Sequence, residues 1–309
     1  MKQLSHLLIA LLATFFLSAC EGTPERAVKV GMCQWPGYEP LFLAAQLNMF
    51  DRPVKILRFS SPGKAYQAFK SGAIDVVGLT ADELLKYADY GSVPKIFLIM
   101  DISNGADALV AKPSVKELKE IKGKRVALES SVLAQYMLHR SLDKAGVSLE
   151  EIEIKNIEIV DQPQAYKDDK ADVFVTFEPS LNMMIQEGGH VIFDTSMIPN
   201  EIVDALAASE NIWKKDQKTI AALKKGWFKA LDYINQHPDR AYEIMGKLEG
   251  ISAQEFKESL SGLSLGTKEI NDEMIKRKQL LPPLQKLQKI MLEKKIVQKE
   301  IDPLLFIGE

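Results

Sequence analysis

Cysteine is scarce in this chain of 309 residues, which contains only Cys20 and Cys33. Two cysteines cannot build a disulfide framework or a metal site of clustered thiolates. His139, His190 and His237 lie far apart and match no metal-binding spacing. The sequence therefore predicts no metal site and no cofactor. Cys33 is interpreted as a small buried strand residue and not as a reactive thiol.

Enzyme signatures and an excess of positive charge are also missing. The chain has no His-Glu-x-x-His zinc motif and no Gly-x-x-x-x-Gly-Lys phosphate loop. It carries 39 Lys and Arg against 42 Asp and Glu, a net charge of −3, which argues against a nucleic-acid partner. At 46% hydrophobic residues it is predicted to fold into a globule. We expect a protein that is not an enzyme.

Long apolar runs are confined to the N-terminus. Residues 7–17 are uncharged and apolar but too few to span a bilayer, so residues 1–19 are predicted to be a signal peptide. The last residues, Leu17-Ser18-Ala19-Cys20, resemble the bacterial lipobox, in which the Cys is diacylated. The alternative is an ordinary signal cleaved near Ala19. We expect a lipid on Cys20, a polar tether over residues 20–26, and a protein held to a membrane in the periplasm or at the cell surface.

After the tether, strands and helices alternate in the manner of an α/β fold. A first unit has strands at 28–31, 54–59, 73–79, 94–101 and 107–112, and a second has strands at 125–129, 152–160, 173–177 and 191–193. From about residue 198 the pattern is helical, beginning with a helix over 201–208. This organisation predicts one lobe from residues 27–108 and 196–309 and another from residues 109–195. Two crossings between the lobes suggest a hinge with a cleft.

Side chains that follow strands are the candidate ligand contacts, because ligands of open α/β sheets collect beyond the carboxyl ends of strands. In "GMCQWPGYEP", Trp35 and Tyr38 are expected on an exposed turn between a strand and a helix, where a purely structural turn would favour Asp, Asn or Gly. Each candidate also has a structural interpretation. The two aromatics could be core residues, Asp82 and Ser131 could cap helices, Asn104 could belong to an ordinary turn, and Glu178 could begin a helix.

The segments "QWPGYEP", "SGAIDVVGLTADE", "GADALVA", "IKGKRVALES" and "ADVFVTFEPS" occur in an order that resembles periplasmic solute-binding proteins of the nitrate, taurine, aliphatic-sulfonate and thiamine-pyrimidine class. The resemblance covers about residues 28–265 and leaves the last 40 or so residues uncovered. It implies a two-lobed type II periplasmic binding-protein fold, a small-molecule ligand between the lobes, and an ABC importer as membrane partner. By position, the resemblance implies these cleft residues: Trp35, Tyr38, Asp82, Asp101, Asn104, Ser131 and Glu178.

The charge of the ligand is predicted from the loops around this cleft. They contain Asp82, Asp101, Asp107, Glu178 and Asp194, and no Lys or Arg occurs in residues 31–51, 78–85, 101–111 or 171–200. A tightly held sulfonate favours an Arg fork, and carboxylates would repel it. We therefore expect a neutral or cationic nitrogen-containing ligand against an aromatic wall of Trp35 and Tyr38.

Two other functions remain open at this point. The same chain could signal through a membrane sensor instead of feeding an importer. Some members of the wider fold family are enzymes that make the thiamine pyrimidine. That route requires clustered cysteines and a cytoplasmic location, and this sequence predicts neither.

Overall fold

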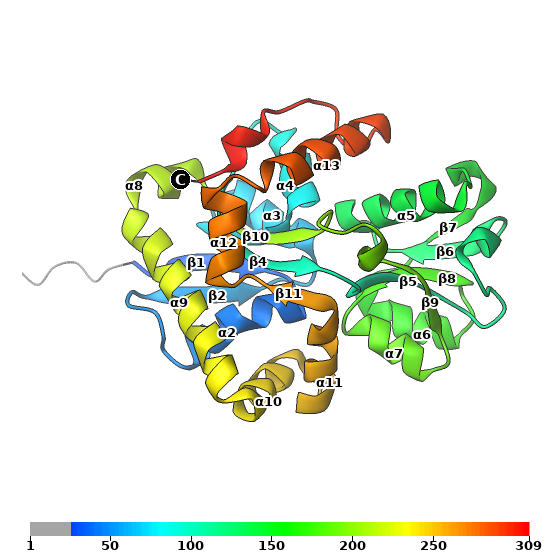
Figure 1. The fold of residues 1–309 in the computed structure, drawn as a ribbon, viewed down its shortest axis with the longest axis horizontal. Helices are drawn as coiled ribbons and strands as arrows, with labels where there is room; N and C mark the ends of the chain where they lie inside the picture. The colour runs from blue at the N-terminus through cyan, green and yellow to red at the C-terminus, as the bar shows by residue number, and fades with distance from the viewer. Residues whose placement is uncertain (1–25, 309) are drawn as a thin grey trace, which may run out of the picture.

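The computed structural model describes residues 26–308. The predicted signal peptide, the predicted lipid site at Cys20 and all of the predicted tether except Arg26 lie outside this range. No helix within it has the length and apolar character needed to cross a membrane. Two sheets lie side by side, each covered by helices (Figure 1).

The first lobe is built on a six-stranded sheet with the order β11-β4-β10-β3-β1-β2. Strand β1 pairs in parallel with β2 and β3, whereas β10 is antiparallel to both β3 and β4, and β11 is antiparallel to β4. The strands span Val28–Met32 (β1), Val54–Arg58 (β2), Val76–Thr80 (β3), Lys95–Ser103 (β4), Val203–Ala208 (β10) and Leu263–Leu265 (β11).

The second lobe is built on a five-stranded sheet with the order β7-β6-β8-β5-β9. Strand β6 is parallel to β7 and β8, and β5 is antiparallel to β8 and β9. The strands span Asp107–Ala111 (β5), Arg125–Leu128 (β6), Glu153–Asn156 (β7), Val173–Phe177 (β8) and His190–Asp194 (β9).

Most of the helices bury an apolar stripe, either against a face of a sheet or against neighbouring helices. Those between the strands are α2 (Glu39–Gln46), α3 (Pro62–Lys70), α4 (Ala81–Ala88), α5 (Val132–Ala145), α6 (Gln162–Lys167) and α7 (Ser180–Gln186). Those after β10 are α8 (Glu210–Lys215), α9 (Gln217–Gln236), α10 (Pro238–Glu249), α11 (Ala253–Ser259), α12 (Lys268–Asn271) and α13 (Leu281–Glu293).

The predicted helix over residues 201–208 is wrong. Residues Val203–Ala208 form strand β10, which is buried along its whole length between β3 and β4. The segment "EIVDALAA" is rich in good helix formers, but a central strand that is buried on both faces shows no alternation of apolar and polar residues. Tertiary packing overrides local propensity here, and the consequence for the site is that Asp204 projects from a strand.

The chain crosses between the lobes twice, and the two crossings are hydrogen-bonded to each other. One crossing joins β4 to β5 through residues 104–106, and the other joins β9 to β10 through residues 195–202. The Thr195 hydroxyl accepts from the Gly105 amide at 2.7 Å and lies 2.8 Å from the Ser103 hydroxyl. These contacts fix the two connecting segments side by side.

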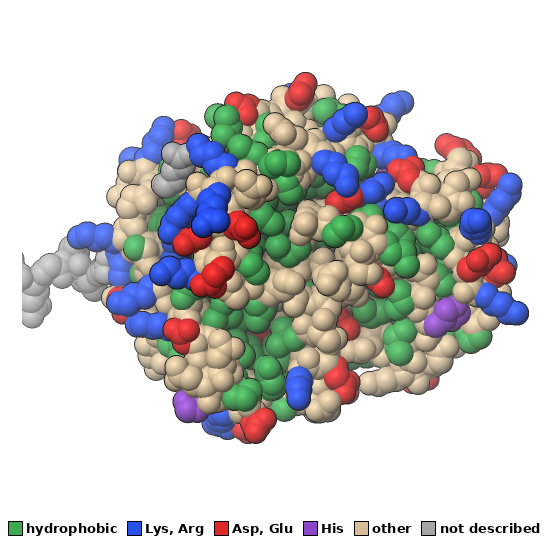
Figure 2. Space-filling view, viewed as in Figure 1, with side chains coloured by type: hydrophobic (Ala, Val, Ile, Leu, Met, Phe, Trp, Pro, Cys, Tyr) green, Lys and Arg blue, Asp and Glu red, His purple; other side chains and the backbone are tan. Residues whose placement is uncertain are grey.

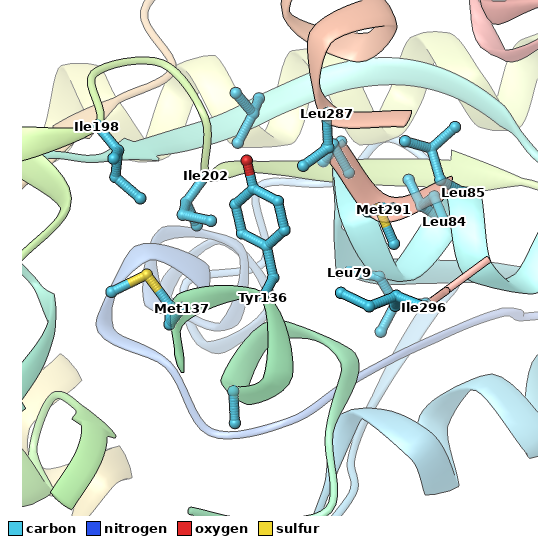
Figure 3. Close-up of a cluster of buried hydrophobic side chains, with 14 of the residues drawn as sticks. Leu79, Leu84, Leu85, Tyr136, Met137, Ile198, Ile202, Leu287, Met291 and Ile296 are labelled. Atoms are coloured by element: carbon cyan, nitrogen blue, oxygen red, sulfur yellow. The ribbon is translucent and has the colours of Figure 1, made fainter. Parts of the chain in front are cut away.

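One buried apolar cluster joins the lobes beside the crossings. Tyr136 and Met137 of α5, from the second lobe, belong to the same cluster as Leu84 of α4 and as Leu287 and Met291 of α13, from the first lobe (Figure 3). Burying a large aliphatic side chain stabilises by about 1.5–3 kcal/mol, so this cluster favours contact between the lobes.

Ion pairs surround the same junction. The carboxylate of Glu201, on the second crossing, accepts from Tyr136 and Arg140 of α5 at 2.6 and 2.7 Å, and Lys286 of α13 lies 2.7 Å from it. Lys294, just after α13, pairs with Asp143 of α5. The C-terminal helix, which lies outside the predicted family resemblance, therefore contacts both lobes.

Candidate functional site

The turn after β1 carries the two predicted aromatic residues. Pro36, Gly37 and Tyr38 form a 3₁₀ turn that leads into α2, and Pro at its first position suits such a turn. Gly37 is required by close packing: a Cβ at this position would lie 2.0 Å from Oδ2 of Asp101 and 2.6 Å from Nε1 of Trp35. The local sequence therefore lets β4 approach this turn closely.

Trp35 and Tyr38 are buried, with 5% and 3% of their surfaces exposed. The indole Nε1 of Trp35 donates to both carboxylate oxygens of Asp101, at 3.3 and 3.2 Å. The hydroxyl of Tyr38 donates to Asp204. The expectation of an exposed turn is thus corrected, because tertiary packing covers it and the polar ends of both rings have carboxylate partners.

Both aromatic residues also line a small cavity between the lobes, which we call the deep cavity. Its volume is about 20 Å³. The rings of Trp35 and Phe177 meet edge to face across it, with centroids 5.7 Å apart and planes at 79°. Its lining residues are Cys33, Gln34, Trp35, Tyr38, Pro62, Thr80, Glu83, Asp107, Leu133, Phe177 and Asp204. They come from both lobes.

The deep cavity is acidic. Three of its lining residues are carboxylic acids, Glu83, Asp107 and Asp204, and none of its described lining residues is Lys, Arg or His. All three acids are buried, with 2% of Asp107 exposed. Burial raises the pKa of Asp107 to about 7, and burial together with neighbouring acids raises the pKa of Glu83 and of Asp204 well above their ordinary values.

Asp107 differs from the other two acids because part of it has no partner. Its Oδ2 is buried and accepts no hydrogen bond within the described structure, although a buried polar atom nearly always has one. Leaving such an atom unpaired costs about 1–3 kcal/mol. The geometry thus leaves one carboxylate oxygen available to a donor that enters the cavity.

A larger pocket, which we call the mouth, continues from the deep cavity towards solvent. Its volume is about 470 Å³, and it shares Cys33, Gln34, Pro62 and Phe177 with the deep cavity. The first lobe contributes residues 58–62 and the second lobe contributes residues around α6 and α7. The side chains that only the mouth contains are Arg58, Phe59, Ser60, Ser61, Ile159, Val160, Pro163, Pro179, Ser180 and Met183.

The remaining predicted site residues lie behind or beside the deep cavity. Asp101 holds Trp35, and burial raises its pKa to about 8. Asp82 is fully buried in the first turn of α4, and its charge helps to raise the pKa of Asp107. Ser131 caps α5 by accepting from the Ala134 amide at 3.1 Å.

Asn104 and Glu178 lie on a separate pocket. It has a volume of about 420 Å³ and shares no lining residue with the deep cavity or the mouth. One carboxylate oxygen of Glu178 accepts from the Asn182 amide at 3.2 Å. The structure therefore brings Trp35 and Tyr38 together at the deep cavity, with Asp101 directly behind them, and places Asn104 and Glu178 elsewhere.

Several lining residues were absent from the predicted site. Asp204 is on the strand that the sequence predicted as a helix, so its direction could not be foreseen. Glu83 belongs to the Thr80-Ala81-Asp82-Glu83 capping box of α4, in which its Oε2 accepts from the Thr80 amide at 3.3 Å, so its sequence context points to a structural role. Asp107 directly follows the first crossing, and Phe177 ends β8. The rule that ligands meet the ends of strands points to both.

The sequence was expected to lack the Gly-x-Ser-x-Gly motif of hydrolases, and this expectation is wrong, because the pattern occurs at residues 262–266. Hydrolases place the Ser of this pattern on a turn between a strand and a helix. Here Ser264 is an exposed residue within the edge strand β11. This local context does not match that of a hydrolase nucleophile.

Two lobes with separate sheets, two crossings and a pocket between them define the type II periplasmic binding-protein fold. The chain is similar to the solved periplasmic aliphatic sulphonate-binding protein SsuA of Escherichia coli, with a TM-score of 0.75 and 16% identity over 92% of this chain and 98% of that one. It is also similar to the ligand-binding component of an ABC-type import system from Staphylococcus aureus, solved with zinc bound. That TM-score is 0.72, with 14% identity over 91% of this chain and 98% of that one.

The sequence comparisons identify the family. The model of the NMT1-like family matches residues 21–247, and the chain belongs to this family. It is 22% identical over 221 residues to the taurine-binding periplasmic protein of Escherichia coli strain K12, which is 69% of each chain. The predicted family resemblance and the predicted fold are confirmed.

Proposed function

We propose that this protein is a solute-binding lipoprotein outside the cytoplasm, which captures a small cationic or N–H-bearing solute between its lobes and presents it to an ABC importer. Family membership and the fold support the binding role. The S. aureus relative is described as part of an ABC-type import system, which supports the membrane partner. The lipobox-like sequence ending at Cys20 supports the lipid anchor and a periplasmic or cell-surface location.

The acidic lining of the deep cavity is the observation that carries the choice of solute. A sulfonate in this cavity would lie against Glu83, Asp107 and Asp204 without any cationic side chain among the lining residues. A cation or an N–H donor instead meets an unpartnered carboxylate oxygen and the face of an aromatic wall. This protein is therefore proposed to hold its solute in the deep cavity through a nitrogen group and not through a sulfonate group.

Charge on the surface is consistent with a small-molecule ligand. On the face shown in Figure 2, basic and acidic side chains lie next to one another without a broad patch of one sign. Nucleic-acid-binding proteins present such a basic patch. The net charge of −3 agrees.

Native mass spectrometry of the full protein, purified in detergent from its host, tests the choice of solute. The predicted result is a bound neutral or cationic nitrogen compound that is recovered chemically unchanged. A bound sulfonate or nitrate would contradict the proposed solute. A chemically altered product would contradict the non-enzymatic role. The membrane partner is tested by measuring whether the protein stimulates the ATPase of the cognate importer in proteoliposomes. If the protein does not stimulate this ATPase but activates a membrane sensor, the result favours the sensor alternative.

A further inference from the structure

The two connected pockets between the lobes differ in charge. The charged residues that line the deep cavity are the acids Glu83, Asp107 and Asp204. The charged residue that lines the mouth is Arg58, and no Asp or Glu occurs among the mouth residues that the structure describes. Because the pockets share four lining residues, a solute that extends from one into the other meets acids at one end and a cation at the other.

Arg58 is held in place on one side and lacks a partner on the other. Its Nη2 donates to the fully buried carboxylate of Glu39 at 2.6 Å, and its guanidinium carbon lies 4.1 Å from the ring centroid of Phe42. Its Nη1 is buried and donates no hydrogen bond within residues 26–308. A buried donor nearly always has a partner, and a guanidinium N–H donates most strongly to an anionic oxygen. The missing acceptor is therefore expected from the solute.

Ser60 supplies a second donor to the mouth, two residues after Arg58. Its side chain is exposed, and its Oγ accepts from the ammonium of Lys64 at 2.7 Å. A hydroxyl carries one hydrogen, and the O–H of Ser60 has no acceptor in the described part of the chain, so it is available to a ligand oxygen. The ammonium of Lys64 also adds positive charge beside the mouth.

The shape and the charge of this site favour a carboxylate among the common oxyanions. The planar guanidinium group matches the geometry of a carboxylate or a phosphate. A phosphate monoester carries up to two negative charges, whereas Arg58 already shares its single positive charge with Glu39. A carboxylate brings only one charge and two oxygens, which suits the two donors.

We infer that Arg58 and Ser60 form a carboxylate subsite in the mouth, and that the solute is an amino acid whose ammonium meets Asp107 and whose carboxylate meets Arg58. This inference rests on the proposed function, which names only a cationic or N–H-bearing solute. It adds a second charged group to that solute and the two residues that select for it. An oxyanion without a nitrogen group gains less, because Glu39 already pairs with Arg58 and the acids of the deep cavity repel it.

Pairs of compounds that differ only in the carboxylate test the inference. 3-Aminopropanoate, 4-aminobutanoate, 5-aminopentanoate and 6-aminohexanoate are titrated calorimetrically at pH 8 into the full protein in detergent. Each is compared with the n-alkylamine in which a methyl group replaces the carboxylate. For the chain length that spans the two pockets, the amino acid is expected to bind about tenfold tighter than its amine, as one charge-assisted hydrogen bond provides. The aminoalkanesulfonate of that length is expected to bind more weakly than the amino acid.

Variants of the mouth locate the effect. Ser60→Ala changes an exposed side chain and should reduce the ratio of the two affinities about threefold or more, while the affinity for the amine stays the same. Arg58→Gln should abolish the ratio, and thermal unfolding establishes that this variant is folded, because it leaves Glu39 without its partner. Ser114→Ala, an exposed serine that lines neither the deep cavity nor the mouth, is the control and should change neither affinity.

The results that would overturn the inference are distinguishable from failure of the proposed function. If no amino acid binds tighter than its matched amine, or if the ratio is unchanged in both Ser60→Ala and a folded Arg58→Gln, the carboxylate subsite is overturned and the preference for a nitrogen group stands. Tighter binding of the aminoalkanesulfonate overturns the choice of a carboxylate. Failure of every amine and every amino acid to bind overturns both this inference and the proposed solute class.

Discussion

Asp107→Asn removes the charge from the deep cavity while keeping the shape of the side chain. The pKa of this carboxyl group is raised to about 7, which is still below pH 8, so the group is mostly ionised at that pH. A hydrogen bond to a charged group contributes about 1.5–3 kcal/mol, and an ion pair at 4 Å gains about 4 kcal/mol at an effective dielectric of about 20 before desolvation is subtracted. We expect the variant to lose about 2–3 kcal/mol of binding, which is about 30- to 150-fold in Kd for an amine.

The same substitution should act in the opposite direction on the ligand-free protein. Raising the pKa from 3.8 to about 7 means that the ionised carboxylate is disfavoured at pH 8 by about 4 kcal/mol, and Asn carries no charge to disfavour. The variant should therefore unfold at the same or a higher temperature than the parent. A loss of affinity combined with undiminished stability separates a ligand contact from a structural residue.

Calorimetric titration of n-pentylamine at pH 8 measures the first effect, and thermal unfolding of the ligand-free protein measures the second. Asp232→Asn, an exposed acid on α9, is the matched control and should change neither quantity. Our reasoning is refuted if Asp107→Asn is folded and binds pentylamine within about threefold of the parent, since that corresponds to well under 1 kcal/mol.

Four further predictions concern the deep cavity, the junction between the lobes and the lipid anchor. Amine affinity should rise by up to about tenfold per pH unit as the pH increases towards about 7, because Asp107 ionises there. The stability of the ligand-free protein should fall between about pH 4 and 7, because the folded state binds more protons than the unfolded state in that window. Calorimetric affinities and melting temperatures that do not change over this range would contradict the burial of this carboxyl group. Gly37→Ala should weaken binding and lower the melting temperature, because the new Cβ would lie 2.0 Å from Oδ2 of Asp101; unchanged melting would show that the turn can give way. Met291→Ala should reduce the free energy of unfolding by about 2–5 kcal/mol and expand the protein in small-angle scattering, because the cluster joins the lobes; equal stability would count against this junction. Cys20→Ser should remove acyl labelling and membrane association, and labelling that persists would exclude the lipid anchor.

Much of the fold was predictable because its signals are local. Strand and helix periodicity, together with signals such as the Ser131 cap of α5, placed most elements within a few residues of their bounds. Strand β10 was not predictable in this way. It pairs along both edges with strands, β3 and β4, that lie about a hundred residues or more away in the sequence.

The site was predicted less completely than the fold, for a related reason. Trp35 and Tyr38 stood out because bulky aromatic residues are unusual on a turn. The acids around them converge from α4, from the start of β5 and from β10, and no spacing in the sequence records that convergence. No feature of the sequence predicts that Glu178 lines a different pocket from Phe177, its immediate neighbour.

The head group of the solute is the most direct test of the account. n-Pentylamine and pentane-1-sulfonate share the same apolar chain and differ only in the sign of the charge that would meet Glu83, Asp107 and Asp204. Both are titrated calorimetrically into the full protein at pH 8. The account predicts that pentylamine binds more than about tenfold tighter, because the Asp107 carboxylate, ionised at pH 8, attracts an ammonium group and repels a sulfonate. Equal or tighter binding of the sulfonate would contradict it.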